Sequence, residues 1–262
     1  MKTRLLELAE EPGIWTPPGP DAEVVEREGY WIVLRELSGS VERIRLGDDE
    51  VPRALEETRR LARKRGLEEM VWWTGELSTP AGLADRLLAL GLTPDPDASS
   101  LTTLGITAEP AGGAEVEVRR VTDRDAFLRA LEIDWEAWEL DADLRRRRRA
   151  RAPDHWEAIA GDPRIEHYLA LLDGRPVGFA RAVFTAWAGL LMGGSTLPSA
   201  RGRGVYRALV HARWKDAVGR DAPRLTSAVG PMSAPILERM GFERIGGMRL
   251  IRDEHAGRGS GR

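Results

Sequence analysis

The chain contains no cysteine among its 262 residues. Without a thiol it forms no disulfide, builds no cysteine-ligated metal cluster and cannot carry an acyl group on a cysteine. Its four histidines, His155, His167, His211 and His255, lack the short paired spacing typical of metal ligands. We therefore expect a chemistry that uses neither a metal nor a thiol of the protein.

Long apolar runs and a strong net charge are also missing. No stretch approaches the roughly 20 apolar residues that a membrane-spanning helix requires. Acidic residues from Glu7 onward do not resemble a signal peptide. A formal net charge of −3 argues against general nucleic-acid binding. The sequence predicts a cytoplasmic protein that does not bind membranes.

The length predicts two domains, because 262 residues exceed the common size of a single domain. With 42% hydrophobic and 31% charged residues, each half has enough apolar side chains to bury a core. Alanine and glycine dominate 107–114, which we predict to be a linker. The predicted domains are 1–106 and 115–255, followed by a flexible tail at 256–262.

A basic, glycine-rich turn is the most informative segment. An apolar strand at 190–197 leads into Arg201, Gly202, Arg203 and Gly204, and an amphipathic helix is predicted over 205–218. The N-terminus of a helix presents amide donors and a partial positive charge, so it attracts anions. The glycines let the backbone approach a ligand closely. This arrangement predicts a pyrophosphate site.

A glycine-rich turn before a helix can also be a dinucleotide-binding motif, a phosphate-binding loop or an ordinary tight turn. A dinucleotide-binding Gly-x-Gly-x-x-Gly pattern needs a third glycine, and Arg207 occupies that position. A phosphate-binding loop needs Gly-Lys-Ser/Thr, which is absent. An ordinary tight turn with solvated arginines stays open.

The rest of the C-terminal half alternates strands and helices. Thr122, with Asp125 three residues later, is typical of a helix start, and helical spacing continues through Leu140. Asp173-Gly174 is typical of a hairpin turn. Further strands are predicted at 115–121, 165–172, 176–186, 224–229 and 242–252, and a short helix at 233–240.

The glycine turn in this setting resembles the acyl-CoA signature of the Gcn5-related N-acetyltransferases (GNAT), written Arg/Gln-x-x-Gly-x-Gly/Ala. Arg201 and Gly204 match it, and Gly202 and Arg203 flank them as in the family, whereas Tyr206 stands where the family has Gly or Ala. The resemblance covers about 115 to 253. It implies an α/β (α+β) domain with a mixed, mostly antiparallel sheet flanked by helices.

The N-terminal half is similar to the C-terminal half in its order of elements. Helix 51–65, strand 69–74, helix 83–90 and strand 100–106 parallel the segment from 205 to 252, and short strands are predicted at 30–36 and 41–46. We therefore predict two tandem GNAT-like domains. The turn at 47–50 is acidic and would repel a pyrophosphate, so the first copy is predicted to be degenerate. An unrelated α/β domain with a chance pattern is the alternative.

The resemblance implies transfer of an acetyl group from acetyl-CoA directly to an amine. A backbone N–H near Ser195 to Leu197 would then stabilise the oxyanion. The cofactor-binding residues implied are Ser195, Thr196, Leu197, Arg201, Gly202, Arg203, Gly204, Val205 and Tyr206.

The proton-transfer groups are less clear from the sequence. The strand from 190 to 195 holds no carboxylate, and Leu237 stands where the family often has a tyrosine acid. Glu139 and His167 are the predicted catalytic residues, with Glu136, Asp141 and Tyr168 as further candidates. A histidine with a near-neutral pKa suits a base.

Trp135, Glu136 and Trp138 are predicted to bind the acceptor, because the tryptophans lie at i and i+3 on one helical face. Packing on the sheet and a solvated face are the alternatives. The basic run Arg145 to Arg149 with Arg151 points all round a helix. It is read either as a solvated helix end or as a contact for CoA phosphates or an acidic acceptor.

The implied partner is a small-molecule or peptide amine, and the oligomeric state is left open, a homodimer included. A non-catalytic acyl-CoA sensor is the alternative function, because the family's usual acid and base are missing. A nucleotide-binding protein that uses the same anion site is a third possibility.

Overall fold

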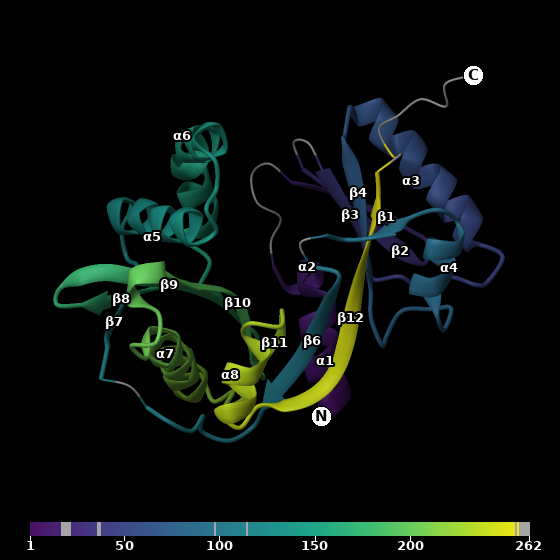
Figure 1. Ribbon diagram of the computed structural model, residues 1–262. Helices are drawn as coiled ribbons and strands as arrows, with labels where there is room; N and C mark the ends of the chain where they lie inside the picture. Colours follow the sequence, from purple (N-terminus) through teal and green to yellow (C-terminus); the bar gives the residue numbers. More distant parts are fainter. Residues whose placement is uncertain (17–21, 36–37, 97, 114, 255, 257–262) are drawn as a thin grey trace. The chain divides into compact units, whose positions relative to one another are not determined.

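The computed structural model describes residues 1–262 except 17–21, 36–37, 97, 114, 255 and 257–262 (Figure 1). His255 and most of the predicted tail thus lie outside the described residues. The chain divides into two compact units. The first unit comprises Met1–Leu104, Ala228–Pro235 and Arg244–Arg262, and the second comprises Gly105–Ser227 and Ile236–Glu243. Each unit includes residues from both predicted domains. That residues 1–106 and 115–255 form separate domains therefore stays a prediction.

The first unit is built on a sheet that the last strand of the chain completes. Strands β1, β2 and β3 pair antiparallel, β3 pairs parallel with β4, and β12 pairs antiparallel with β4. The elements that lie in this unit or reach into it from the N-terminal half are α1 (Lys2–Glu10), α2 (Pro12–Trp15), β1 (Glu23–Arg27), β2 (Tyr30–Leu34), β3 (Ser38–Glu42), α3 (Val51–Arg65), β4 (Glu69–Thr74), α4 (Leu83–Ala89), β5 (Thr93–Pro94) and β6 (Ser100–Ile106), with β12 (Glu243–Asp253) from the other end. The predicted strand at 41–46 is therefore displaced, because the structure ends β3 at Glu42.

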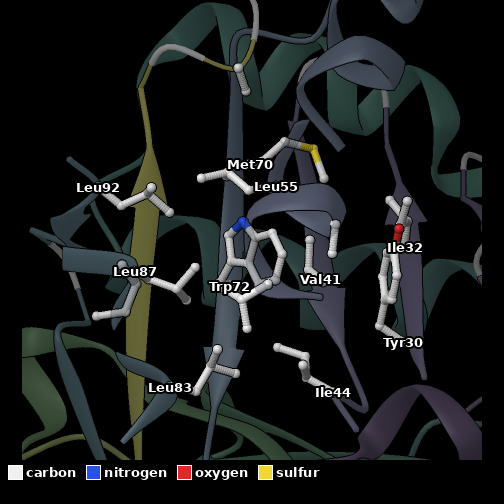
Figure 2. Packing of buried hydrophobic residues seen from close by; sticks show 14 of the residues in the cluster. Tyr30, Ile32, Val41, Ile44, Leu55, Met70, Trp72, Leu83, Leu87 and Leu92 are labelled. Atoms are coloured by element: carbon white, nitrogen blue, oxygen red, sulfur yellow. The ribbon is translucent and has the colours of Figure 1, made fainter. Parts of the chain in front are cut away.

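Trp72 lies at the centre of the core of the first unit, as Figure 2 shows. Residues of β4 alternate between buried and half-buried, which places Trp72 inside with 0% of its surface exposed. Leu55 from α3, Val41 from β3 and Leu87 from α4 belong to the same cluster. Trp72 is therefore a core residue of β4.

The second unit has a sheet with helices on both faces (Figure 1). Strands β7 to β10 pair antiparallel in chain order, and β10 pairs parallel with β11. Helices α5 and α6 belong to one face and α7 to the other. The elements are β7 (Glu117–Arg120), α5 (Arg124–Ala137), α6 (Ala142–Ile159), β8 (Ile165–Leu172), β9 (Arg175–Phe184), β10 (Gly189–Thr196), η1 (Pro198–Ala200) and α7 (Val205–Gly219), with β11 (Leu225–Val229) and α8 (Ala234–Arg239) crossing the division between the units.

Alternation along β9 separates the two faces. Phe179 packs with Phe127 of α5 and Leu169 of β8 in one cluster. On the other face, a Cβ placed on Gly178 would lie 2.5 Å from Val205 Cγ1 and 3.3 Å from Leu209 Cδ1. Because Gly178 has no side chain, α7 approaches the sheet at van der Waals distance.

The start of the first helix of this unit differs from the sequence prediction. Asp123, in extended conformation, is the N-cap of α5, and its side chain accepts a hydrogen bond from Ala126 N at 2.8 Å. The predicted helix start at Thr122 is therefore one residue too early, because the capping oxygen comes from the residue that directly precedes the first helical turn. The helix also ends at Ala137, and a second helix, α6, begins after Asp141.

The two units repeat one order of elements. In the first, β1–β2–β3 is an antiparallel meander and α3 connects β3 to the parallel β4. In the second, β8–β9–β10 is the meander and α7 connects β10 to the parallel β11. The predicted fold class, mixed and mostly antiparallel sheets flanked by helices in tandem, is confirmed.

Replacing Trp72 by alanine should lower the free energy of unfolding by about 3–5 kcal/mol, because it empties the centre of a packed core. Chemical denaturation monitored by circular dichroism measures the loss. Trp138→Ala is the control, since that side chain is 63% exposed and should cost far less. Equal losses for the two variants would contradict the packing described above.

Candidate active site

Strand β10 leaves its pairing with β11 early. The parallel register contains only Gly189 opposite Leu225 and Leu190 opposite Thr226. Its antiparallel pairing with β9 continues to Thr196, with a register shift between Met192 and Gly194. Gly193 at this bulge has φ +62°, which a residue with a Cβ rarely adopts. Bulges of this kind re-aim backbone groups and occur often beside active sites.

The predicted glycine turn opens α7. Gly202 and Gly204 have φ of +78° and +82°, and Gly204 is the N-cap. No side chain of the described residues caps this end of the helix, and Ala208 N is the first amide bonded within it, to Gly204 O. A Cβ on Gly202 would meet no described atom within 4 Å. The N-terminus of α7 is thus not capped by a side chain of the N-cap residue, as an anion site requires.

The arginines of the turn have different partners. Arg201, Arg203 and Arg207 are exposed. Arg203 lies 3.7 Å from Asp173 in an exposed ion pair, which stabilises little. Arg207 Nη1 lies 3.7 Å from the position of a Cβ on Gly112. All three side chains are accessible to an anion from solvent.

Tyr206 packs against the bulge of β10. A Cβ on Gly194 would lie 2.9 Å from Tyr206 Cε2, so the ring covers the face of β10 that carries no side chain there. The family's Gly or Ala would leave this space open. Tyr206 therefore occupies volume beside the end of β10.

Backbone donors of β10 point alternately to its two sides. Leu197 N donates to Val177 O at 2.9 Å, so this amide, one of those predicted to stabilise an oxyanion, belongs to the sheet. Because donors alternate along an antiparallel strand, the N–H groups of Thr196 and Gly194 point away from β9. Thr196 Oγ1 is buried and has no hydrogen-bond partner among the described residues.

A half-buried carboxylate lies on the α5 face of β10. Ser195, 6% exposed, donates from Oγ to Asp134 Oδ1 of α5 at 2.7 Å. Burial raises the pKa of Asp134 above its ordinary value. Hydrogen bonds from Ser195 and Trp138 and the charges of Arg148 and Arg181 oppose that shift. Sequence reasoning missed Asp134, because its separation of 61 positions from Ser195 gives no spacing signal.

The predicted histidine lies in the same layer, on β8. His167 is 5% exposed, and its ring packs against Phe127 at 5.1 Å and Phe179 at 6.0 Å between centroids. Burial lowers the pKa of His167 to about 3, and the charges of Arg181 and His155 act in the same direction. The imidazole is therefore neutral at pH 7 and a weak base.

The other predicted residues lie around the end of α5. Trp135 is 3% exposed and belongs to the core, whereas Trp138 is 63% exposed, so the pair does not form one apolar surface. Glu136 is exposed. Glu139 is also exposed and has φ +53°, beyond the end of the helix. Asp141 is the N-cap of α6, where it accepts from Leu144 N.

The arginine run lies in the first half of α6, and several of its members have partners. Arg145 donates from Nε to Leu140 O at 2.7 Å and from Nη2 to Trp135 O at 3.3 Å, which ties α6 to the end of α5. Arg146 pairs with Asp143 and Arg149 with Glu132. The arginine run therefore lies within a regular helix, and contacts with neighbouring residues hold several of its side chains.

The corresponding turn of the first unit carries its own anion. Glu50 is the N-cap of α3, and its Oε2 accepts from Gly47 N at 2.6 Å. Proline at the second helical position, Pro52, removes another donor. Since a carboxylate already satisfies the turn, a pyrophosphate would be repelled.

In the described part of the chain, no group of three or more His, Cys, Asp or Glu is arranged to hold a metal ion. None of the described helices has the length and apolar character to cross a membrane.

Comparison with known proteins agrees with this geometry. Residues 127–242 match the model of the acetyltransferase (GNAT) family. A GCN5-related N-acetyltransferase from Kribbella flavida has 19% identity and a TM-score of 0.67, over 89% of this chain and 90% of that one. A tandem GNAT protein from the clavulanic acid biosynthesis pathway has 18% identity and a TM-score of 0.62, over 92% and 86%. No curated protein matches the sequence.

The chain is therefore an α/β protein with a tandem acetyltransferase fold. The match of residues 127–242 to the acetyltransferase (GNAT) family model supports acyl transfer in general.

Replacing His167 by phenylalanine should make stability less sensitive to acid. Unfolded histidine binds a proton below about pH 6.5, whereas the folded residue does so only near its lowered pKa of about 3. Wild-type stability therefore falls between these values as pH decreases, by about 1.4 kcal/mol per unit at most for one proton.

Urea unfolding at several pH values measures the effect as the difference between the two proteins. The free energy of unfolding of the variant, relative to that of the wild type, should rise steadily as the pH falls from 6 to 4. A constant difference over that range would mean that His167 is protonated normally in the folded protein.

Proposed function

We propose that the protein is an N-acetyltransferase that moves an acetyl group from acetyl-CoA directly to an amine. The observation that carries the proposal is the left-handed Gly202–Gly204 turn, which opens α7 without a side-chain cap. It lies in the segment that matches the family model. The early end of the β10–β11 ladder supplies backbone donors next to this turn.

The donor would be held by residues of one continuous segment. The first-turn amides of α7 would bind the pyrophosphate together with Arg201, Gly202, Arg203, Gly204, Val205 and Tyr206. Ser195, Thr196 and Leu197 would line the pantetheine side. The buried Thr196 Oγ1, which has no partner among the described residues, suits a hydrogen bond to a polar ligand group.

Acetyl-CoA supplies an acetyl group activated as a thioester. The chain's own part in the reaction is to bind the donor, orient the amine and move its proton. We assign the proton acceptor to Asp134, because its half-buried carboxylate has a raised pKa and is bonded to Ser195 of β10. The amine proton would pass to Asp134, directly or through Ser195 Oγ, as the nitrogen bonds to the carbonyl carbon and the thiolate leaves.

The predicted bases suit this task less well. A pKa of about 3 makes His167 a poor proton acceptor at neutral pH. Glu139 is exposed at the end of α5, where it and Glu136 are placed to attract a cationic amine. Trp138 would contact the acceptor, whereas Trp135 packs in the core.

The acceptor class within amines stays open, since acceptor loops vary on one fold. A cytoplasmic location, and an oligomeric state that includes a homodimer, stay predictions from the sequence.

Calorimetry should detect one acetyl-CoA site per chain, because the corresponding turn of the first unit already holds the Glu50 carboxylate. The double variant Arg201→Ala, Gly204→Glu should abolish binding, since it removes a cation and adds a carboxylate at the helix N-terminus. Arg129→Ala, Gly161→Glu is the matched control, because both positions are exposed and lie on other elements than the turn. Two sites per chain, or unchanged binding by the first variant, would contradict the proposed site.

Asp134→Asn should lower kcat by about 10²–10⁴, the usual contribution of a general base, while acetyl-CoA affinity is kept. The assay is release of free thiol in the presence of the best acceptor from an amine library. The wild-type rate should rise with pH through the raised pKa of Asp134, because the base must be ionised. Asp143→Asn, at an exposed position on α6, is the control. A wild-type rate in Asp134→Asn would remove Asp134 from the mechanism, and thiol release that no amine increases would favour the acyl-CoA sensor.

A further inference from the structure

Arg213 of α7 is a fully buried cation. Its side chain is 0% exposed, and no ion pair of the described residues includes it. Burial lowers the pKa of Arg213, which the nearby Tyr206 and Tyr168 oppose. Burying an unpaired charge costs free energy. We therefore expect Arg213 to make interactions that offset this cost.

The guanidinium of Arg213 holds backbone oxygens at the bulge of β10. Nη1 donates to Gly193 O at 3.2 Å and to Arg181 O of β9 at 3.3 Å. Nε donates to Leu209 O of its own helix at 3.0 Å. Nη2 is buried without a partner among the described residues. Arg213 thus ties the two strands together where their regular pairing shifts.

Holding Gly193 O also fixes the next amide. In a trans peptide the C=O and the following N–H point in opposite directions. Since Gly193 O points to Arg213 and to the side of β9, Gly194 N–H points away from them. The alternation counted from Leu197 N gives the same result. On that side the ladder with β11 has already ended.

A cation at the oxygen of a peptide also strengthens its N–H as a donor. Hydrogen bonds in series polarise one another, and a charged donor does so most. Arg213, which bonds to the oxygen of the Gly193–Gly194 peptide, therefore both orients and polarises the N–H on the other side of that peptide.

We propose that Arg213 is a positioning residue that orients and polarises the Gly193–Gly194 peptide, so that Gly194 N–H donates to the thioester carbonyl oxygen of the bound acyl donor. This inference rests on the proposed function. Negative charge develops on that oxygen as the amine attacks, and a preorganised donor is the usual means of stabilising it. Arg213 itself touches neither substrate.

The test is the ¹³C NMR shift of [1-¹³C]acetyl-CoA bound to the full chain, which reports polarisation of the carbonyl without any acceptor. The wild type should shift the carbonyl signal downfield from its free position. Arg213→Met should lose most of that shift while its dissociation constant for CoA, measured by calorimetry, stays within a few-fold. Arg220→Met, which removes an arginine bonded to Pro163 O and Glu166, should keep the shift.

An unchanged carbonyl shift in Arg213→Met would overturn the proposal and leave Arg213 a purely structural residue. No binding of acetyl-CoA to the wild type would instead refute the proposed function. If Arg213→Met does not fold, the ¹⁵N–¹H signal of Gly194 in the wild type decides. It should move on adding acetyl-CoA and much less on adding CoA, and equal movements would overturn the assignment of the donor.

Discussion

Close packing of α7 against the sheet is the constraint on which the candidate active site depends. This packing requires that two positions of the sheet carry no side chain. Val205 and Leu209 pack on Gly178 of β9, and Tyr206 packs on Gly194 of β10. This contact fixes the first turn of α7 beside the end of β10. The amides proposed to bind an anion, the donors of β10 and the buried arginine all take their positions from it.

The same topology gives different chemistry in the two units. Both place a helix between two parallel strands, and both present the N-terminus of that helix at the end of the first strand. In the first unit the strands pair over four residues, Ser38 to Val41, and Glu50 bonds to its own turn. In the second unit the ladder stops after two residues, and the turn is built of left-handed glycines. Local backbone conformation, more than the fold, decides which copy can receive a polyanion.

Much of the second unit could be predicted, because its strands and helices follow simple periods. The strand at 165–172 and the start of the helix at Val205 agree with the structure. The left-handed glycines before α7 could also be predicted, because that conformation leaves a signature in residue type. Their use as a pyrophosphate site stays a prediction.

Other features leave no such signature. Helix α6 escaped prediction because its arginines and Pro153 hide any apolar period. The bulge at Gly193 depends on how two strands align, and the partners of Asp134 and Arg213 lie 61 and 20 to 32 residues away. That β12 pairs with β4 was equally hidden, because Arg249 and Thr74 are 175 residues apart. Tertiary contacts of this kind are set by the whole fold rather than by local pattern.

The position of β12 has a consequence for synthesis of the chain. Domains usually fold as they leave the ribosome, with N-terminal ones first. Here β4 pairs with β3 early, but it gains its second neighbour only when residues up to Asp253 have been made. Until then the other edge of β4 lacks its partner strand and has to be protected from other chains.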